Sequence, residues 1–353
     1  MSLTRCPACG SQEFRLAVKT GAIKKEIELR RSFVLDRIGR RAARSELKDL
    51  IDFMHGFPAP LARCSDCGVL VRGEQRVPEA HSYEDDPNDP DLMAHVFPLY
   101  LEAFRRKQDV YRPLLKPYVD VLEIGSHLGA FLQTAEEWSW NAAALDVGSD
   151  TAEFARSRGF RVQQGIIEEA FISPRSLEAV FIWNCFEQIP DPDGMLKAIY
   201  RVLKPHGLLV VRVPNALFYT LLSRSLHAPE HNRWVVDALA YNNLLGFPYL
   251  YGYTAEALNR LASRYAFKPV SGANSELVTM PFPDVTRRIT GEQIQISRAV
   301  SRWSAAALEG GLLAGPWVEM IFRKLEEPEW KAHQPIAGLR RRDIDTRFLE
   351  RAA

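Results

Sequence analysis

The sequence is poor in long apolar runs, and this shortage argues against a membrane-spanning protein. The richest apolar stretch, from Leu308 to Phe322, is interrupted by Glu309, Pro316 and Glu319. No segment therefore approaches the roughly 18 uncharged residues that a membrane helix needs. The first residues, MSLTRCPACGSQEF, also lack the apolar run of a secretory signal. We therefore expect a cytoplasmic protein.

An excess of charge is missing as well. The 353 residues include 45 basic and 44 acidic side chains, which leaves a formal net charge of +1. This balance gives no electrostatic reason to expect nucleic acid or a membrane surface as a partner, although a local basic patch remains open. The 46% hydrophobic and 25% charged composition is that of an ordinary globular protein. The length gives room for one large domain, or for one domain with a smaller appendage.

The chain divides into four parts by composition and pattern. Residues 1–80 contain two cysteine pairs, and residues 81–118 form a helical linker with apolar residues at roughly helical spacing. Residues 119–330 form the main domain, which includes an irregular, aromatic-rich insertion at 217–265 that we interpret as a lid over a ligand pocket. Residues 331–353 form a basic, solvated tail.

Short apolar runs alternate with amphipathic segments in the main domain. The pattern predicts strands at Val119–Ile124, Ala142–Val147, Arg161–Gly165, Ala179–Trp183, Gly207–Val213, Lys268–Ser271 and Trp317–Arg323. It predicts helices at Ala130–Trp138, Thr151–Arg158 and Met195–Leu203. We expect Ser149 or Asp150 to cap the second of these helices. Such alternation is typical of an α/β fold in which helices cover both faces of a parallel sheet.

A glycine-bearing loop joins the first of these strands to its helix. It runs Glu123-Ile124-Gly125-Ser126-His127-Leu128-Gly129, and its glycines let the backbone turn tightly beside a ligand. Asp146, at the end of the next strand, can accept hydrogen bonds from both hydroxyls of a ribose. The dinucleotide pattern Gly-x-Gly-x-x-Gly is not met, because His127 stands at its middle glycine. Glu123 would repel a pyrophosphate but suits the amino group of a methionine moiety, which favours a cationic cofactor.

Later blocks are more specific. The fourth strand runs into Trp183-Asn184-Cys185-Phe186-Glu187-Gln188, and after a helix come Leu203-Lys204-Pro205-His206-Gly207, another strand and Pro214-Asn215. This order resembles class I S-adenosylmethionine-dependent methyltransferases of the small-molecule type over roughly residues 119–270, with His206 replacing one glycine of their Leu-Lys-Pro-Gly-Gly turn. The resemblance implies a Rossmann-like fold with a mostly parallel seven-stranded sheet, and S-adenosylmethionine as cofactor.

The same resemblance implies roles for single residues. The methionine end of the cofactor would be lined by Glu123, Gly125, Ser126, His127 and Gly129. Asp146 would hold the ribose, with Val147 beside the adenine and with Ile166 and Ile167 flanking its ring. Asn184 would face the transferring methyl group, and Cys185 would pack near the cofactor as a small residue.

Four of the five cysteines form two Cys-x-x-Cys-Gly motifs. They are Cys6-Pro7-Ala8-Cys9-Gly10 and Cys64-Ser65-Asp66-Cys67-Gly68. Each motif turns two thiolates toward one point, and two motifs complete a tetrahedral zinc site that leaves no position open for catalysis. We therefore expect a structural zinc ion rather than an iron–sulfur cluster. A redox-active pair and unligated thiols are the weaker alternatives.

The 54 residues between the two cysteine pairs are many for a zinc ribbon. Apolar residues from Ile23 to Phe53 indicate an inserted helical segment. Its basic stretch, Lys24 to Arg44, is either a solvated helix face, which we favour, or a nucleic-acid contact. A zinc ribbon before a methyltransferase domain resembles the sugar C-methyltransferases of deoxysugar pathways and their shorter relatives. This chain has no room for the further C-terminal catalytic domain of those enzymes, which leaves the acceptor open.

The candidate catalytic residues come from two places. Relatives often carry a histidine and a Glu-His pair after the fourth strand, where this sequence has Asn184, Glu187 and Gln188. Either the general base comes from elsewhere or the acceptor needs none. Glu187 is one candidate, and His231 and Tyr251 are two more from the aromatic segment that follows Asn215.

We expect an enzyme that methylates a small-molecule acceptor, such as a glycan, a sugar nucleotide or a secondary-metabolite intermediate. One alternative is a zinc-ribbon interaction module that binds the cofactor without turnover. Another is an RNA or protein methyltransferase steered by the basic stretch. The segment from Gly291 to Leu313 is expected to be a helix that covers the sheet or forms the contact of a homodimer.

Overall fold

The computed structural model describes residues 5–21, 60–72, 90–223, 249–275 and 312–326. They belong to two compact units. The described residues of the first unit come from 1–75, 213–258 and 274–319, and those of the second come from 76–212, 259–273 and 320–353. None of the helices in the described part of the chain is both long enough and apolar enough to span a bilayer.

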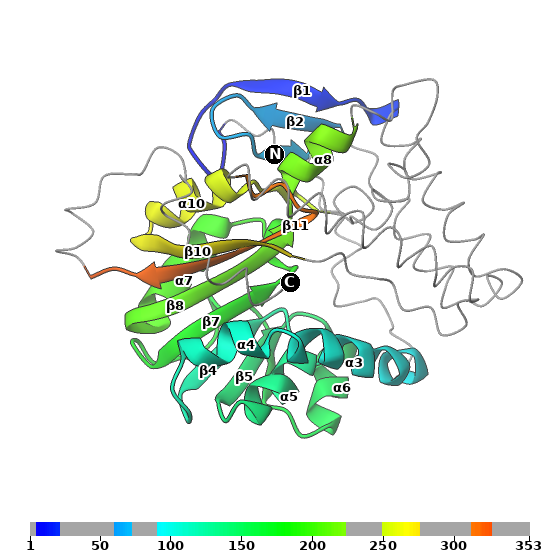
Figure 1. The fold of residues 1–353 in the computed structure, drawn as a ribbon, viewed down its shortest axis with the longest axis vertical. Helices are drawn as coiled ribbons and strands as arrows, with labels where there is room; N and C mark the ends of the chain where they lie inside the picture. Colours follow the sequence, from blue (N-terminus) through cyan, green and yellow to red (C-terminus); the bar gives the residue numbers. More distant parts are fainter. Residues whose placement is uncertain (1–4, 22–59, 73–89, 224–248, 276–311, 327–353) are drawn as a thin grey trace, which may run out of the picture. The chain divides into compact units, whose positions relative to one another are not determined.

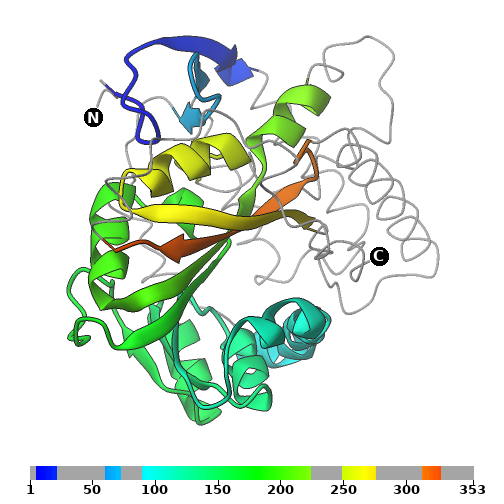
Figure 2. The same ribbon diagram turned by 60° about the vertical axis from the view of Figure 1, so that its left-hand side comes forward.

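A mixed, mostly parallel sheet of seven strands organises the α/β part of the chain (Figure 1). Its order is β10-β11-β8-β7-β4-β5-β6, and Figure 2 shows β10, β11 and β8 as neighbours. The pairs β4–β5, β4–β7, β5–β6 and β7–β8 are parallel. The strands are β4 (Asp120–Ile124), β5 (Asn141–Asp146), β6 (Val162–Gln164), β7 (Leu177–Trp183), β8 (Leu203–Pro214), β10 (Phe267–Ser275) and β11 (Trp317–Lys324). The predicted fold class is confirmed.

The helices of the described residues include the three predicted at 130–138, 151–158 and 195–203, and two more that fall mostly within the stretch predicted as an irregular insertion at 217–265. They are α3 (Pro90–Arg105), α4 (Gln108–Tyr111), α5 (Ala130–Glu137), α6 (Ser149–Ser157), α7 (Pro192–Val202), α8 (Ala216–Ser223) and α10 (Ala255–Ser263), with 3-10 helices η2 (Arg112–Leu114) and η3 (Phe186–Gln188). In α3, Met93, Phe97 and Leu101 are buried at intervals of four residues, which places them on one face. That helix packs against α5.

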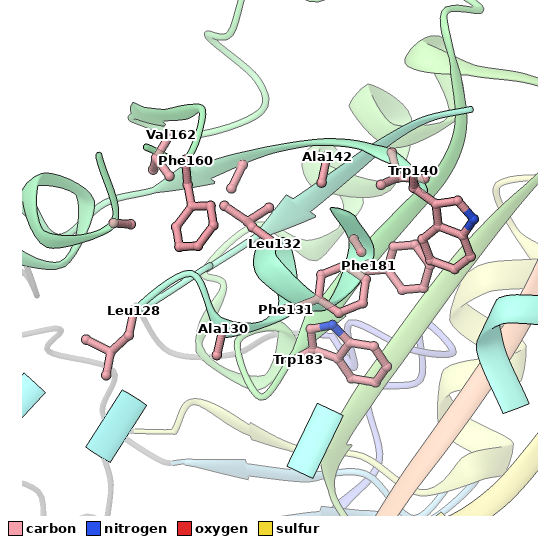
Figure 3. Packing of buried hydrophobic residues seen from close by; sticks show 14 of the residues in the cluster. Leu128, Ala130, Phe131, Leu132, Trp140, Ala142, Phe160, Val162, Phe181 and Trp183 are labelled. Carbon is pink, nitrogen blue, oxygen red and sulfur yellow. The ribbon is translucent and has the colours of Figure 1, made fainter. Parts of the chain in front are cut away.

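A cluster of aromatic rings holds α5 against the sheet. Alternation along β7 puts Phe181 and Trp183 on the same face of the strand. The ring of Phe131, from the first turn of α5, lies 4.6 Å from that of Phe181 and 5.5 Å from that of Trp183, centroid to centroid (Figure 3). The cluster continues through Phe104, Tyr111, Trp138 and Trp140. Because aromatic pairs contribute beyond their buried area, this packing fixes the start of α5 and the loop before it.

The predicted cap of α6 is wrong. The N-cap residue is Gly148, and no side chain caps the helix there. Ser149 Oγ instead donates to Asp150 Oδ1 at 3.3 Å. Asp146, three residues before the helix, accepts hydrogen bonds from Gly148 N and Thr151 Oγ1. The acid at the strand end therefore satisfies donors at the start of the helix, which leaves no need for a cap at the expected positions.

Helix α7 and strand β8 begin earlier than predicted. Asp191 caps α7 by accepting from Gly194 N, and Pro192 occupies the first turn, where its missing N–H costs nothing. In β8, Leu203 pairs with Leu177 and Leu208 pairs with Ala179. Five steps along β8 thus match two along β7, so the predicted turn at 203–207 is an irregularity inside the strand.

A second sheet, of four strands, belongs to the first unit and has the order β1-β2-β3-β9. Its strands are β1 (Phe14–Val18), β2 (Leu61–Cys64), β3 (Leu70–Arg72) and β9 (Tyr251–Gly252), all paired antiparallel. The first three come from the cysteine-bearing segment, and the fourth comes from the stretch predicted as a lid. The ribbon is therefore completed by a strand from a distant part of the chain.

Three predictions fall largely or wholly outside the described residues. They are the helical insertion from Ile23 to Phe53, the segment from Gly291 to Leu313 and the basic tail. The proposed domain boundaries and the homodimer remain predictions.

Replacing Phe131 by alanine should destabilise the fold strongly. The side chain is 1% exposed and contacts four other aromatic rings. Emptying such a site typically costs about 3–5 kcal/mol, which denaturant unfolding would measure. Phe171→Ala is the matched control, because that ring is fully exposed and its removal should change the free energy of unfolding by less than about 0.5 kcal/mol. Equal losses in the two variants would contradict this account of the core.

Candidate cofactor site and metal centre

The loop between β4 and α5 needs glycine at two of its predicted positions. Gly125 has φ 75° and Gly129 has φ 78°, a region that other residues rarely adopt. A Cβ on Gly125 would lie 2.8 Å from both Cβ and Sγ of Cys185, which belongs to the loop after β7. A Cβ on Gly129 would lie 2.8 Å from the ring of Phe160. The loop after β4 is thus in contact with the loop after β7.

His127, at the middle position of the loop, is exposed and also has a positive φ, of 47°. Its ring lies 5.6 Å from that of Tyr100 on α3 in an edge-on arrangement. Its backbone N donates to Asp146 Oδ2 at 2.6 Å. The hydrogen bond and the ring contact offset the strain of a left-handed histidine, which is of order 1–3 kcal/mol.

The carboxylate of Asp146 is held in place by three donors. Oδ2 accepts from His127 N at 2.6 Å, and Oδ1 accepts from Gly148 N at 2.9 Å and from Thr151 Oγ1 at 3.0 Å. A carboxylate has about four lone-pair positions, so about one is left for a ligand. The side chain is therefore fixed at the end of β5 but offers less capacity than the predicted pair of ribose hydroxyls requires.

Acidic side chains gather around Cys185. Burial raises the pKa of its thiol, and the charges of Glu187, Asp146 and Glu123 raise it further. Glu123 is 2% exposed, and its Oε2 has no hydrogen-bond partner within the described residues. Burial and the charge of Asp146 raise the pKa of Glu123 well above its usual value. The buried Oγ of Ser126 likewise has no partner in the described part of the chain.

Glu187 is the most deeply buried of these acids. It lies on η3, is fully buried, and neither carboxyl oxygen has a hydrogen-bond partner among the residues described. Burial raises its pKa to about 8, although its own backbone amide and the charge of Arg212 act in the opposite direction. A buried acid without a partner costs stability, and groups of this kind are concentrated at functional sites.

The remaining predicted cofactor residues are placed as follows. Asn184 begins the loop after β7 and binds Arg212 through its side chain and its backbone N. Val147 directly follows β5 and is half-buried. Ile166 is 39% exposed whereas Ile167 is fully buried, so of these two only Ile166 has surface available to a ligand.

The four cysteines of the two motifs converge as predicted. Their sulfur atoms all lie within 4.8 Å of one another, with 3.5 Å between Cys6 and Cys67 and also between Cys9 and Cys64. The two turns are alike: Gly10 N donates to Cys6 O, and Gly68 N donates to Cys64 O. Both glycines have positive φ, of 76° and 75°. Each motif therefore closes in the same way around one point.

This cluster is consistent with a structural zinc ion. Four sulfurs at about 2.3 Å from a tetrahedral zinc lie about 3.8 Å apart, close to the spacing seen. Without a cation the thiols compete for protons. Hydrogen bonding from Cys67 lowers the pKa of Cys6 to about 5, and the pKa of Cys67 is raised chiefly by the same pairing. A divalent cation would let all four ionise.

The metal cluster is tied to residues 249–258 by hydrogen bonds within the first unit. Arg72 is 3% exposed, its Nε donates to Tyr249 O at 2.8 Å, and its backbone N donates to Leu250 O at 3.0 Å. Thr254 Oγ1 donates to Cys67 O at 3.3 Å and accepts from Ala257 N at the start of α10. The zinc ribbon and the start of α10 therefore share one hydrogen-bonded network.

The other two predicted catalytic residues come from later in the sequence than the acidic cluster. His231 is outside the described residues. Tyr251 is 5% exposed in β9, where it pairs with Val71 and its ring lies 5.8 Å from that of Tyr253. Sequence reasoning missed Tyr100 and Arg212, because each reaches the site through a partner that is distant in sequence and no local motif marks either of them.

The sheet order, the glycine loop after β4 and the acid at the end of β5 together define the class I fold of S-adenosylmethionine-dependent methyltransferases. A family model described as a methyltransferase domain matches residues 86–271, which is more than half of the chain. The chain therefore belongs to this family and is an S-adenosylmethionine-dependent methyltransferase.

Solved structures with similar folds have low sequence identity to this chain. A Haloferax volcanii methyltransferase, solved in complex with the Trm112 methyltransferase activator, is 12% identical with a TM-score of 0.46, and the match covers 70% of this chain and 99% of that one. A methyltransferase from Archaeoglobus fulgidus is 19% identical (TM-score 0.43, coverage 66% and 99%). Phosphoethanolamine N-methyltransferase 2 from Haemonchus contortus, in complex with S-adenosyl-L-methionine, is 14% identical (TM-score 0.46, coverage 70% and 61%). No curated protein sequence matches the chain.

Gly125→Ala should abolish binding of S-adenosylmethionine in calorimetry. The new methyl group would overlap Cys185 at 2.8 Å and push apart the two loops that form the site. Gly159→Ala is the matched control: its φ is also positive, at 91°, but nothing lies within 4 Å of the added Cβ. The control should be strained without losing the cofactor. Equal binding by the two variants would show that the contact of the loops is not required.

Metal analysis of the full-length protein should find one zinc per chain. Cys67→Ser should lose it, because a three-sulfur site binds zinc more weakly, and Cys185→Ser should keep it as the control. Loss of the metal should also speed amide hydrogen exchange in residues 249–258, since Cys67 O anchors Thr254. Unchanged exchange in that segment after zinc removal would contradict the proposed network.

Proposed function

We propose that this enzyme methylates a small-molecule acceptor that loses a proton as it is methylated, and that Glu187 is the general base. The observation that carries the proposal is the buried carboxyl of Glu187, whose two oxygens lack partners among the described residues. It follows Cys185 by two residues, and Cys185 touches the cofactor loop at Gly125. A general base has to lie within reach of the reacting atoms, and the contact between the loops provides this nearness.

The acidic cluster suits a cationic cofactor. S-adenosylmethionine carries a positive sulfur and a positive amino group, and Glu123, Asp146 and Glu187 surround Cys185 with negative or ionisable groups. We assign the amino end to Glu123 and Ser126, whose buried oxygens lack partners in the described part of the chain. Such atoms indicate a missing ligand or water.

We assign the remaining parts of the cofactor to residues of the loops that follow the parallel strands. Asp146 would hold the ribose through the one lone-pair position that remains, with Val147 and Ile166 beside the adenine. The methionine end of the cofactor would lie against the backbone of the loop after β4, at Gly125, His127 and Gly129. Asn184 and Cys185 would face the methyl group, and Ile167 would support Ile166 from within the core.

The chemistry divides simply between cofactor and chain. The bound cofactor supplies an electrophilic methyl group. Glu187 accepts the proton that the acceptor's hydroxyl or amine gives up, and the acidic cluster would interact more strongly with the positive sulfur of the cofactor than with the neutral sulfur of its demethylated product. His231 and Tyr251 stay predictions for the acceptor pocket.

A small acceptor is favoured by the balance of 45 basic and 44 acidic residues, which provides no attraction for polyanions. The basic stretch that motivated an RNA or protein acceptor lies outside the described residues. The cofactor-binding module without activity is disfavoured by Glu187, because an uncompensated buried acid reduces stability and is retained where function needs it.

Glu187→Gln should retain cofactor binding and lower turnover about 10²–10⁴-fold, the usual contribution of a general base. Turnover would be followed as release of S-adenosylhomocysteine across a panel of hydroxyl and amine compounds. For the wild type, kcat/KM should rise with pH and level off above about 8, where Glu187 is ionised. Full activity of the variant, or cofactor binding without turnover of any compound in the panel, would contradict the proposal.

Glu187→Gln also tests the raised pKa of Glu187 in an experiment that needs no methyl acceptor. The pKa of Glu187 rises from an ordinary value of 4.5 to about 8 on folding, so its contribution to stability is complete below pH 4.5 and is lost as the pH rises to about 8. Glu187→Gln should therefore become more stable than wild type, by roughly 1.4 kcal/mol per pH unit across that window. A difference that does not change with pH would show that Glu187 is not a buried acid.

A further inference from the structure

Arg212 on β8 binds Asn184 through both main chain and side chain. Arg212 is 6% exposed and lies beside Trp183 in the β7–β8 pairing. Its Nη1 donates to Asn184 Oδ1 at 2.5 Å, and its carbonyl oxygen accepts from Asn184 N at 2.9 Å. A buried arginine that makes two contacts with one residue is a strong geometric constraint on that residue.

Asn184 is strained as well as bound. Its φ is 55°, in the left-handed region, which costs a residue other than glycine of order 1–3 kcal/mol. A third hydrogen bond, from Gln188 Nε2 to Asn184 O at 3.0 Å, closes the loop that carries Cys185 and Glu187. Since the Glu187 carboxyl has no hydrogen bond of its own within the described residues, its position depends on this loop backbone.

Arg212 also determines which group of the Asn184 side-chain amide is available to a ligand. A guanidinium has donors only, so the oxygen of Asn184 must face Arg212 whatever the rest of the site contains. The Nδ2 group makes no hydrogen bond in the described part of the chain. The Nδ2 group is thus the donor that the side chain of Asn184 can offer to a ligand.

We propose that Arg212 is a positioning residue of the methyltransferase site. Through Asn184 it fixes the loop that carries Glu187, and it directs the amide N–H groups of Asn184 to the acceptor. The acceptor then presents a hydrogen-bond-accepting oxygen to this position, as a hydroxyl, carbonyl or carboxylate does and an ammonium does not. This inference rests on the proposed role of Glu187.

The charge of Arg212 supports the same arrangement. It acts to lower the pKa of Glu187 and that of Tyr100 on α3, against the burial that raises both. The charge of Glu187 in turn adds to the burial that raises the pKa of the Cys185 thiol in the same loop. A fixed positive charge beside the carboxyl favours its ionised form, which is the form a base requires.

The test titrates Glu187 in three backgrounds and needs no acceptor. The free energy of unfolding would be measured against pH for pairs of proteins that differ only by Glu187→Gln. One pair has the wild-type arginine at position 212, the second carries Arg212→Gln and the third carries Arg212→Lys. Arg212→Gln removes the charge, so the midpoint should move above about 8. Arg212→Lys keeps the charge and should restore the midpoint, although it loses the planar fork that binds Asn184. Arg323→Gln, an exposed arginine on β11, should change nothing.

A double-mutant cycle tests the contact itself. If Arg212 acts through Asn184, the double variant Arg212→Gln/Asn184→Ala should melt no lower than the less stable of the two single variants. Additive losses, or a Glu187 titration that is the same in Arg212→Gln as in wild type, would overturn the inference. A wild-type titration that is absent would instead refute the proposed base.

A second variant tests the same inference if Arg212→Gln does not fold. Asn184→Asp should fold, because a carboxylate pairs with Arg212 in place of the amide oxygen, and its negative charge should raise the midpoint of Glu187 above the wild-type value. A lowered or unchanged midpoint in this variant would contradict the arrangement, as would failure to fold.

Discussion

The parallel pairing of β4 with β7 is the constraint on which the candidate site depends. Their register, with Ile124 opposite Ile182, brings both strands to an end at the same edge of the sheet. The glycine loop and the loop of Asn184 therefore leave the sheet together and touch at Gly125 and Cys185. Ligands of open α/β sheets bind at such an edge, where loops meet beyond the carboxyl ends of the strands. The aromatic packing of Phe131 against Phe181 then fixes the helix that the glycine loop begins.

Two acids at this edge are treated in opposite ways by their surroundings. Asp146 receives three hydrogen bonds from the chain, which hold the carboxylate in one place. Glu187 receives none from the described residues and is fully buried. The first arrangement suits a rigid binding group, and the second suits a group that exchanges a proton near neutral pH. The two acids therefore differ in how firmly the chain holds them, although both lie near the carboxyl ends of the parallel strands.

Much of the fold followed from the sequence because the parallel strands are short apolar runs bounded by helices of clear periodicity. The glycine loop, Asp146 and the cysteine pairs were also predictable, since their chemistry depends on residue types at close spacing. What could not be predicted depends on contacts between distant residues. The bond from Arg212 to Asn184 joins positions 28 apart, and β9 is a strand of two residues with no pattern of its own. Likewise, the cap of α6 failed because Asp146 satisfies donors that the local sequence assigns to Ser149 or Asp150.

The completion of the zinc ribbon by β9 has a consequence for folding during synthesis of the chain. Arg72 and Tyr249 are 177 residues apart, and at about 5–20 residues per second of synthesis the partner strand emerges on the order of ten seconds or more after the cysteines. Until then β3 is an unpaired sheet edge, which invites association with other chains. Early capture of zinc by the four thiolates would order the first three strands during this interval. A zinc ion bound to this cluster would therefore protect the nascent protein before the ribbon is complete.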